Sequence, residues 1–189
     1  MKIQSAAVVG LGLIGGSVAR DLAALGVRVL GRDRDASAVG AAVEEGVVAS
    51  ALGDDLSGVQ DAELVVLALP VSAAAAALRA LRPHLGAARL VTDVGSTKRG
   101  IIAAAVECDL GDRFVGSHPL AGSEASGWSA SREGLFRDAP VYLSPTPATA
   151  PPALSLAREL WTALGGVHVE CRAEQALAGE VEVRRPEPA

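Results

Sequence analysis

The feature that most constrains the fold is a set of three glycines, Gly10, Gly12 and Gly15, at the junction of two apolar segments. Residues 6–9 have the length and composition of a strand, and residues 13–25 carry leucines at helical spacing. In a strand–turn–helix unit, the first glycine permits a tight turn, the second lets a pyrophosphate approach the backbone, and the third lets helix and strand pack closely. The alternative is that the glycines serve only the turn. We favour the first interpretation, which predicts a dinucleotide site.

Cofactor recognition is expected to involve residues on both sides of this turn. Leu13 and Ile14 open the helix, so they should lie against the pyrophosphate, which free amides and the helix dipole attract. The next apolar segment ends at Asp33, whose carboxylate would accept hydrogen bonds from ribose hydroxyls and repel a 2′-phosphate. NAD is therefore the expected cofactor. Arg32 and Arg34 leave NADP open, since an arginine at this place can accommodate that phosphate.

Strand-like and helix-like segments alternate along the rest of the chain. Expected strands are residues 27–31, 47–49, 64–69, 90–92, 113–116, 141–144 and 167–170, and expected helices are residues 36–45, 72–83, 96–107 and 153–164. The run LVVLAL at residues 64–69 is apolar throughout, which is typical of a strand covered on both faces. The alternation predicts an α/β fold with a doubly wound, mostly parallel sheet of the Rossmann type.

Composition and charge narrow the class of protein. The 189 residues suffice for one domain with a sizeable core. The net charge of −5, without a long block of like charges, argues against nucleic acid and membranes as partners. No apolar run reaches the ~18 residues of a membrane span, and no signal sequence precedes the first strand, so a cytoplasmic protein is expected. Cys108 and Cys171 are expected to be reduced thiols, and no metal site is expected.

Two further strand ends are expected to border the cofactor, because ligands of such sheets bind outside the carboxyl ends of the strands. The residues at these ends are Leu69, Pro70, Gly95, Ser96 and Lys98. Ser96 or the neighbouring Thr97 could instead cap the following helix. Lys98 is one of two lysines among 17 basic residues, which indicates a need for a compact ammonium at this position unless the choice is chance.

One of the three histidines stands out by its surroundings. His118 lies in the segment GSHPLAGSE, directly after an expected strand, in a stretch too polar and glycine-rich for a core. Such a histidine is a candidate general acid–base, since its ordinary pKa is close to neutral pH. His84, beside a helix end, and His168, in a short strand, are better explained as structural residues.

Five motifs taken in order resemble those of prephenate dehydrogenase and its arogenate-using relatives: VVGLGLIGGSVA, LGRDR, LVVLALPV, VTDVGSTK and FVGSHPLAGSEASGW. The resemblance spans residues 3–145. The first motif is common to many dehydrogenases, whereas DVGSTK together with SHPLAGSE is much more specific. The implied activity is the NAD-dependent oxidative decarboxylation of prephenate to 4-hydroxyphenylpyruvate in tyrosine biosynthesis.

The resemblance also implies roles for particular residues. His118 matches the family's catalytic histidine, which takes the proton of the substrate's 4-hydroxyl as a carbonyl forms. Ser96 matches a serine that helps to orient this hydroxyl. Ser123, Glu124 and Lys98 fall on positions that the resemblance places near the substrate.

A division of the chain follows from the resemblance as well. Residues 1–170 correspond to the family's NAD-binding domain, and residues 171–189 form a short tail where the family has a helical dimerisation domain. Three interpretations stay open: a prephenate dehydrogenase, an arogenate dehydrogenase, or a truncated NAD-binding module with little or no turnover. The implied partners are a small-molecule substrate and, through dimerisation, a second copy of the chain.

Overall fold

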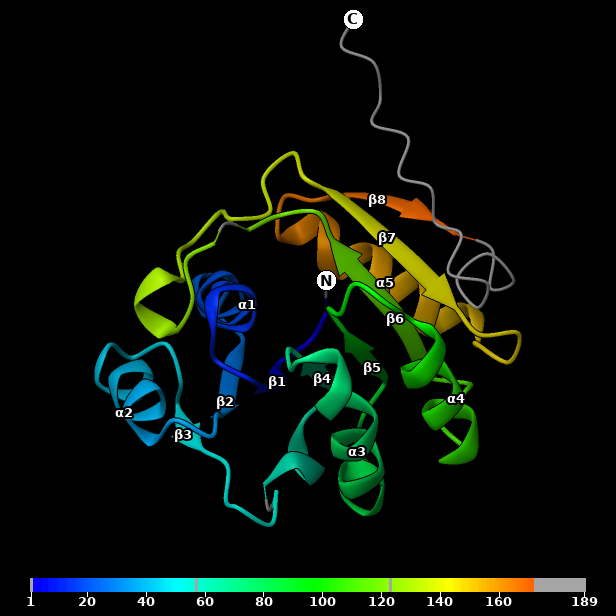
Figure 1. Ribbon diagram of the computed structural model, residues 1–189, viewed down its shortest axis with the longest axis horizontal. Coiled ribbons are helices and arrows are strands. Elements are labelled where there is room, and N and C mark those ends of the chain that lie inside the picture. Colours follow the sequence, from blue (N-terminus) through cyan, green and yellow to red (C-terminus); the bar gives the residue numbers. More distant parts are fainter. Residues whose placement is uncertain (1, 57, 123, 172–189) are drawn as a thin grey trace, which may run out of the picture.

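In the described part of the chain, eight strands form one sheet in the order β3-β2-β1-β4-β5-β6-β7-β8 (Figure 1). The computed structural model describes residues 2–56, 58–122 and 124–171. The strands are β1 (Ser5–Val9), β2 (Arg28–Arg32), β3 (Ser50–Ala51), β4 (Leu64–Leu67), β5 (Leu90–Asp93), β6 (Phe114–Pro119), β7 (Pro140–Pro145) and β8 (Val167–Glu170). The α-helices are α1 (Leu13–Ala24), α2 (Ala36–Glu44), α3 (Val71–Leu81), α4 (Arg99–Glu107) and α5 (Pro151–Ala163). None of these helices is long and apolar enough to cross a membrane.

The sheet is wound in two directions from its centre. Strands β1 to β6 are parallel, β7 runs antiparallel to β6, and β8 is parallel to β7. The chain winds outward from β1 through β2 to β3, returns to β4 beside β1, and then winds outward on the other side. The switch point between β1 and β4 is where doubly wound sheets bind their ligands. The predicted fold class is confirmed.

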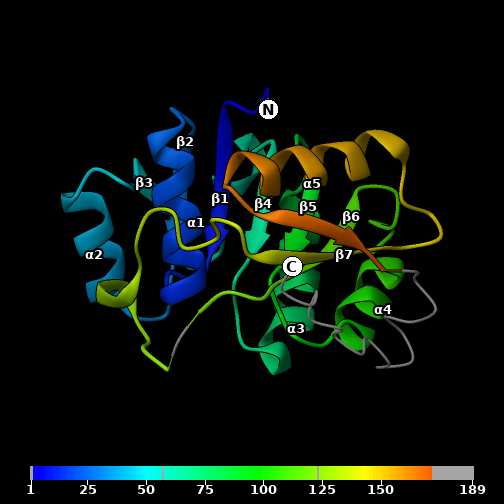
Figure 2. The same cartoon turned by 90° about the horizontal axis from the view of Figure 1, so that it is seen from above.

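Alternation along the central strands builds a separate core on each face of the sheet. In β1, Ala6 and Val8 belong to the core under α1, α2 and α5, whereas Ala7 and Val9 belong to the core under α3 and α4. Figures 1 and 2 show these helices as layers on the two sides of the sheet. All residues of β4 are fully buried. The run at residues 64–69 is therefore apolar for the reason predicted from the sequence, because both faces of the strand are covered.

Several element boundaries differ from those predicted. The third strand is Ser50–Ala51, where it pairs with β2, and not residues 47–49. Helix α4 begins at Arg99, after an N-cap at Lys98, and no side chain bonds to its first amides. Ser96 and Thr97 therefore do not cap this helix. Both stay exposed in the connection from β5 to α4.

Strand β6 is longer than predicted, and the difference changes the position of His118. The expected strand at residues 113–116 continues to Pro119, because residues 115–119 pair with the antiparallel strand β7. His118 therefore lies within a strand and not in a loop as expected. The loop that follows contains a short 3₁₀ helix, Trp128–Ala130.

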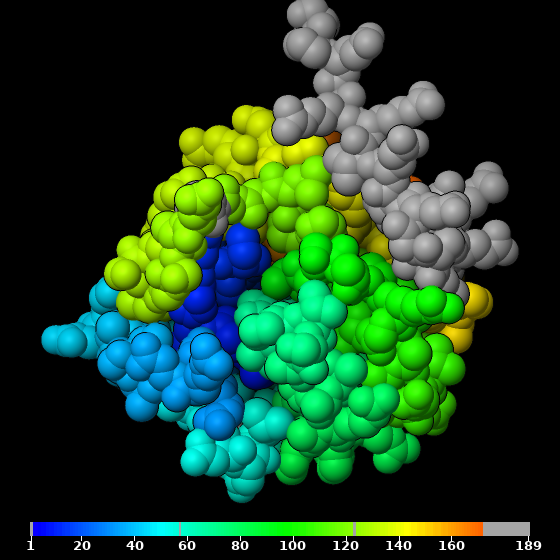
Figure 3. Space-filling model, in the orientation of Figure 1, coloured from blue at the N-terminus to red at the C-terminus, as the bar shows by residue number. Residues whose placement is uncertain are grey.

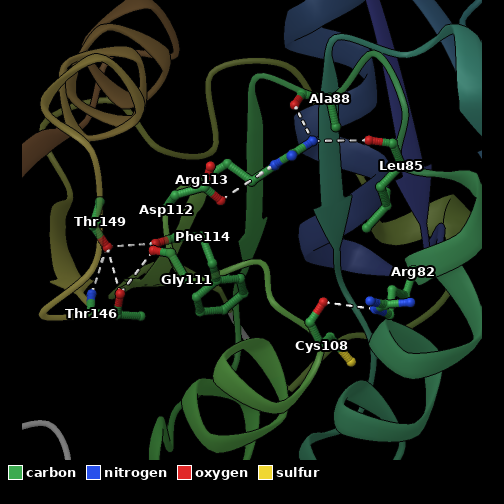
Figure 4. Close-up of polar contacts among 10 residues, drawn as sticks. All are labelled: Arg82, Leu85, Ala88, Cys108, Gly111, Asp112, Arg113, Phe114, Thr146 and Thr149. Atoms are coloured by element: carbon green, nitrogen blue, oxygen red, sulfur yellow. Dashed lines mark hydrogen bonds and ion pairs between the residues drawn. The ribbon is translucent and has the colours of Figure 1, made fainter.

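Hydrogen bonds close the end of the sheet at which β5 and β6 begin (Figure 4). Arg113 Nη1 donates to the carbonyl oxygens of Leu85 and Ala88, at 3.1 and 3.3 Å. Thr149 Oγ1 donates to the carbonyl oxygen of Phe114 at 2.9 Å. These bonds satisfy carbonyl groups in the connections, where no regular ladder or helix does so.

Helix α5 is attached to β6 through a buried tryptophan. Trp161 is fully buried, and its ring meets Phe136 edge to face with 5.3 Å between centroids. Its Nε1 donates to Ser117 Oγ at 2.9 Å, and the same hydroxyl bonds to Thr92 Oγ1 at 2.8 Å. Ser117 thus fixes β6 from the α5 side, one residue before His118.

Replacing Trp161 with alanine is expected to lower the free energy of unfolding by about 3–5 kcal/mol, because the change leaves a cavity and removes the donor to Ser117. Urea denaturation followed by circular dichroism measures this loss. Trp161→Phe serves as the control, since it keeps most of the ring and should cost much less. A loss below about 1 kcal/mol for the alanine variant, the size of an average substitution, would contradict the packing described for α5.

Candidate nucleotide-binding and catalytic site

The turn between β1 and α1 brings backbone atoms so close that side chains are excluded. Gly10 has a φ of +98°, and a Cβ on it would lie 2.2 Å from the carbonyl oxygen of Ala68. A Cβ on Gly15 would lie 1.9 Å from the carbonyl oxygen of Gly10. Only glycine fits either position without moving backbone. The tight turn and the close packing of helix on strand are the geometry that the glycine motif predicts.

Gly12 leaves the N-terminus of α1 open. It is the N-cap residue, and no side chain bonds to the first amides of the helix. No heavy atom lies within 4 Å of the place where its Cβ would be. Free N–H groups at the positive end of a helix dipole form a binding site for phosphate. The open backbone and the free amides fit the pyrophosphate of a dinucleotide.

A cleft of about 390 Å³ lies at this helix end. Figure 3 shows a hollow there, with atoms of the N-terminal part of the chain, in blue, at its floor. Half of the predicted cofactor-binding residues line the cleft, namely Gly12, Leu13, Ile14, Gly15 and Leu69. The turn after β1 and the residues after β4 therefore meet, as expected for the switch point of the sheet.

Sequence reasoning missed the remaining lining residues. Ala68 and Val94 follow the buried strands β4 and β5, and their positions at strand ends were the available signal. Ala121 and Gly122 come from the loop after β6. Residues 125–127 of the same loop complete the wall. Small residues throughout this loop are the signal that it approaches a ligand closely.

Asp33 stands beside the glycine turn, directly after β2. Its Oδ2 accepts a hydrogen bond from the amide of Leu11 at 2.6 Å, and its Oδ1 accepts one from the amide of Asp35 at 2.9 Å. These bonds fix the carboxylate next to the turn and leave lone pairs for ribose hydroxyls. Arg32 is paired with Asp54 at 2.6 Å, whereas Arg34 is exposed.

A buried ion pair lies at the end of β5. The Nζ of Lys98 is 2.5 Å from Oδ2 of Asp93, and the two side chains are 5% and 2% exposed. The amide of Gly95 donates to the same oxygen at 2.9 Å. Burial raises the pKa of Asp93 and lowers the pKa of Lys98, while their mutual attraction opposes both shifts. The short contact is typical of a charge-assisted hydrogen bond, which indicates that both side chains are charged.

His118 lies on the strand next to this ion pair. Gly116 pairs with Asp93 across the sheet, and a Cβ on Gly116 would lie 2.8 Å from Cδ of Lys98. The missing side chain thus makes room for the lysine stem. His118 is two residues further along β6, so it faces the same side of the sheet. Burial and the charge of Lys98 both lower the pKa of His118, which keeps its imidazole neutral and able to accept a proton.

Ser96, Glu124 and Pro70 lie in connections whose neighbouring residues line the cleft. Ser96 is exposed between β5 and α4, and Glu124 is exposed in the loop after β6. Ser123 lies outside the described residues. Pro70 is the N-cap residue of α3, next to the cleft residue Leu69.

Lys98 has a different contact from the one expected. Its ammonium bonds to Asp93 in the interior, because the space beside Gly116 lets the stem fold back along the sheet. Direct contact between Lys98 and a substrate therefore stays a prediction. Within the described residues, Lys98 also acts on His118 electrostatically, because its charge lowers the pKa of the imidazole.

Comparisons with known proteins agree with this geometry. Residues 18–170 match the family model for the nucleotide-binding domain of prephenate dehydrogenase. A prephenate dehydrogenase of Bacillus subtilis is 37% identical over 172 residues, which are 88% of this chain and 46% of that protein. The chain thus spans about half the length of this curated relative.

Two solved structures are similar over most of the chain. The arogenate dehydrogenase of Synechocystis has a TM-score of 0.84 and 39% identity, over 91% of this chain and 61% of that one. The prephenate dehydrogenase of Aquifex aeolicus, in complex with hydroxyphenyl propionate and NAD+, has a TM-score of 0.85 and 31% identity, over 93% of this chain and 62% of that one. The chain therefore belongs to the prephenate dehydrogenase family and carries its nucleotide-binding domain.

Proposed function

We propose that this chain is an NAD-dependent dehydrogenase that converts prephenate to 4-hydroxyphenylpyruvate with loss of carbon dioxide. The observation that carries the proposal is His118, a half-buried histidine whose pKa is lowered by burial and by the charge of Lys98, near the end of the strand that pairs with Asp93. A neutral imidazole at the carboxyl edge of a nucleotide-binding sheet is placed as a general base for an alcohol oxidation.

The residues around the glycine turn would hold the cofactor. The amides at the start of α1 would bind the pyrophosphate, and Asp33 would accept hydrogen bonds from the adenosine ribose. When bound, the nicotinamide supplies the acceptor for the hydride. Pro70 and Gly95 stand at the ends of the neighbouring strands and would border it. Arg34 is exposed beside Asp33 and would lie against the adenosine end.

His118 would accept the proton of the substrate hydroxyl as the carbonyl forms. Because Lys98 disfavours a second positive charge nearby, the imidazole is free to take this proton at neutral pH. Ser96 would hydrogen-bond to the same hydroxyl and orient it. Glu124 and Ser123 would contact the substrate at the mouth of the site.

The choice of NAD over NADP rests on Asp33. Its carboxylate, fixed beside the turn by two amides, would repel a 2′-phosphate. Arg32 is engaged with Asp54, so of the two flanking arginines only Arg34 would be available for such a phosphate within the described residues.

Arogenate is the second candidate substrate, since a structural relative carries that name. It differs from prephenate in the side chain, away from the hydroxyl that His118 would address. We further propose a homodimer, as the family resemblance implies, and a cytoplasmic location, as the sequence analysis predicts. Residues 1–170 would form the cofactor domain, and residues 171–189 a short tail.

Turnover of the purified chain tests the proposed function. NADH formation is measured with prephenate and with arogenate, each with NAD and with NADP, and we expect activity with NAD and prephenate. His118→Asn should lower the turnover number ~10²–10⁴-fold, the contribution of a general base. NAD binding by calorimetry should survive the change, because His118 does not line the nucleotide cleft. Near-normal turnover in this variant would refute the role of His118, and NAD binding without NADH from either substrate would favour a binding module.

The pH dependence of kcat/KM gives a separate prediction. The neutral form of His118 is the active one, so activity should fall as the pH drops through the lowered pKa of this group. Removing the ion pair in an Asp93→Asn/Lys98→Met double variant should raise that pKa and move the acid limb to higher pH. The double change is used because a single Lys98→Met variant leaves a buried uncompensated carboxylate. An acid limb that stays in place would contradict the role of Lys98.

A further inference from the structure

A cluster of polar and aromatic side chains joins the second half of α1, the end of α2 and the loop that follows β6. Its members are Arg20, Glu45, Trp128 and Ser131, and we refer to them as the clamp. Trp128 is buried, 6% exposed, although sequence reasoning placed it only in a polar loop. The nucleotide site described above does not explain why these four side chains meet.

The contacts within the clamp are short and mutually consistent. Trp128 Nε1 donates to Oε1 of Glu45 at 2.8 Å, and Arg20 Nη2 lies 2.8 Å from Oε2 of the same carboxylate. The Arg20 guanidinium stands over the Trp128 ring, 4.1 Å from its centroid. Arg20 Nε donates to Ser131 Oγ at 2.9 Å. Each side chain therefore fixes at least one other member.

The clamp presses the loop against the first turns of α1. A Cβ on Gly16 would lie 2.6 Å from Cβ of Ser131 and 3.1 Å from Cε3 of Trp128, so the loop packs where this residue has no side chain. In the next position, Ser17 Oγ accepts a hydrogen bond from the amide of Arg132 at 3.0 Å. The attachment thus follows directly after Gly15, the last glycine of the nucleotide turn.

The same loop forms a wall of the nucleotide cleft. Residues 125–127 line the cleft immediately before Trp128. Gly122 lies close to α1 as well, because a Cβ on it would be 3.5 Å from Cδ1 of Ile14. At its other end the loop begins at β6, the strand that carries His118. The wall is therefore held by a sheet strand on one side and by the clamp on the other.

We propose that Trp128 is a positioning residue for the cofactor, which acts by holding the cleft-lining residues of this loop, 121, 122 and 125–127, against the glycine turn. The proposal rests on the proposed function, since it takes NAD as the ligand of the cleft. If the wall is already ordered before NAD binds, no binding free energy is used to order it. Loss of the clamp should therefore weaken NAD binding. A merely structural role would lower stability and leave the affinity of the folded protein unchanged.

Calorimetric titration of the full chain with NAD tests the proposal. Trp128→Ala should raise the dissociation constant roughly tenfold or more. Trp128→Phe should recover most of the affinity, because it keeps a ring under Arg20 and loses only the bond to Glu45. Glu45→Gln should also bind more weakly than the unaltered chain. It keeps an oxygen for Trp128 and loses the charge that faces Arg20.

Thr149→Val is the matched control. Thr149 bonds to the carbonyl oxygen of Phe114 at the opposite end of the sheet (Figure 4), so its loss should lower the melting temperature and leave NAD affinity unchanged. If Trp128→Ala is not folded by circular dichroism, Glu45→Gln and Trp128→Phe carry the comparison against this control.

The possible failures are distinguishable. Unchanged NAD affinity in folded Trp128→Ala, or in Glu45→Gln if the alanine variant does not fold, would overturn the role of the clamp and leave the proposed function intact. An equal loss of affinity in Thr149→Val would also overturn it, because any destabilising change would then weaken binding. No NAD binding by the unaltered chain would refute the proposed function, and the clamp proposal with it.

Discussion

The close contact between the end of β1 and the start of α1 determines the arrangement of the rest of the site. A methyl group on Gly15 would lie 1.9 Å from the carbonyl oxygen of Gly10, so the helix can start where it does only because this residue has no side chain. The contact directs the free amides of α1 toward the cleft. It also places Gly16 and Ser17 against the loop after β6. Phosphate binding and attachment of the loop are therefore two consequences of one backbone approach.

The buried ion pair between Lys98 and Asp93 determines much of the electrostatics of the site. Lys98 is buried against Asp93, so water screens its charge less than that of an exposed lysine and its field reaches the neighbouring strand. Burial and the charge of the ammonium both lower the pKa of the His118 imidazole, although the ion pair is nearly neutral as a whole. A neutral imidazole and a positive charge can thus lie close together.

The sequence predicted those parts of the structure that depend on local pattern. The glycine spacing located the nucleotide turn, and the apolar run at residues 64–69 located a strand that is buried on both faces. The end of β6 could not be predicted in this way. Its last residues are polar or proline, and their pairing partner is β7, which lies some twenty residues further along the chain. The sequence therefore places His118 in a loop, whereas it lies within β6.

For the same reason, contacts between side chains that are distant in the sequence could not be predicted from the local pattern. Lys98 was singled out by its rarity in the composition, but its partner Asp93 and the space beside Gly116 are properties of adjacent strands. Trp128 ends one of the motifs, but a single tryptophan in a glycine-rich loop has no periodicity from which its contacts could be predicted. Its position became clear only from the carboxylate of Glu45, which belongs to another helix end.

The position of His118 within a strand has a consequence for catalysis. A base carried by a loop has to be ordered when the substrate binds, whereas His118 pairs with Tyr142 of β7 and follows Ser117, which is bonded to α5. The backbone of the proposed base is therefore held in place by the sheet before any ligand arrives, and such preorganisation favours proton transfer. The loop that leaves this strand ends at Trp128, and it lines the cleft on the way. A change in the wall of the cleft is thus connected covalently to the strand that carries His118, so the fold links the nucleotide site to the proposed base.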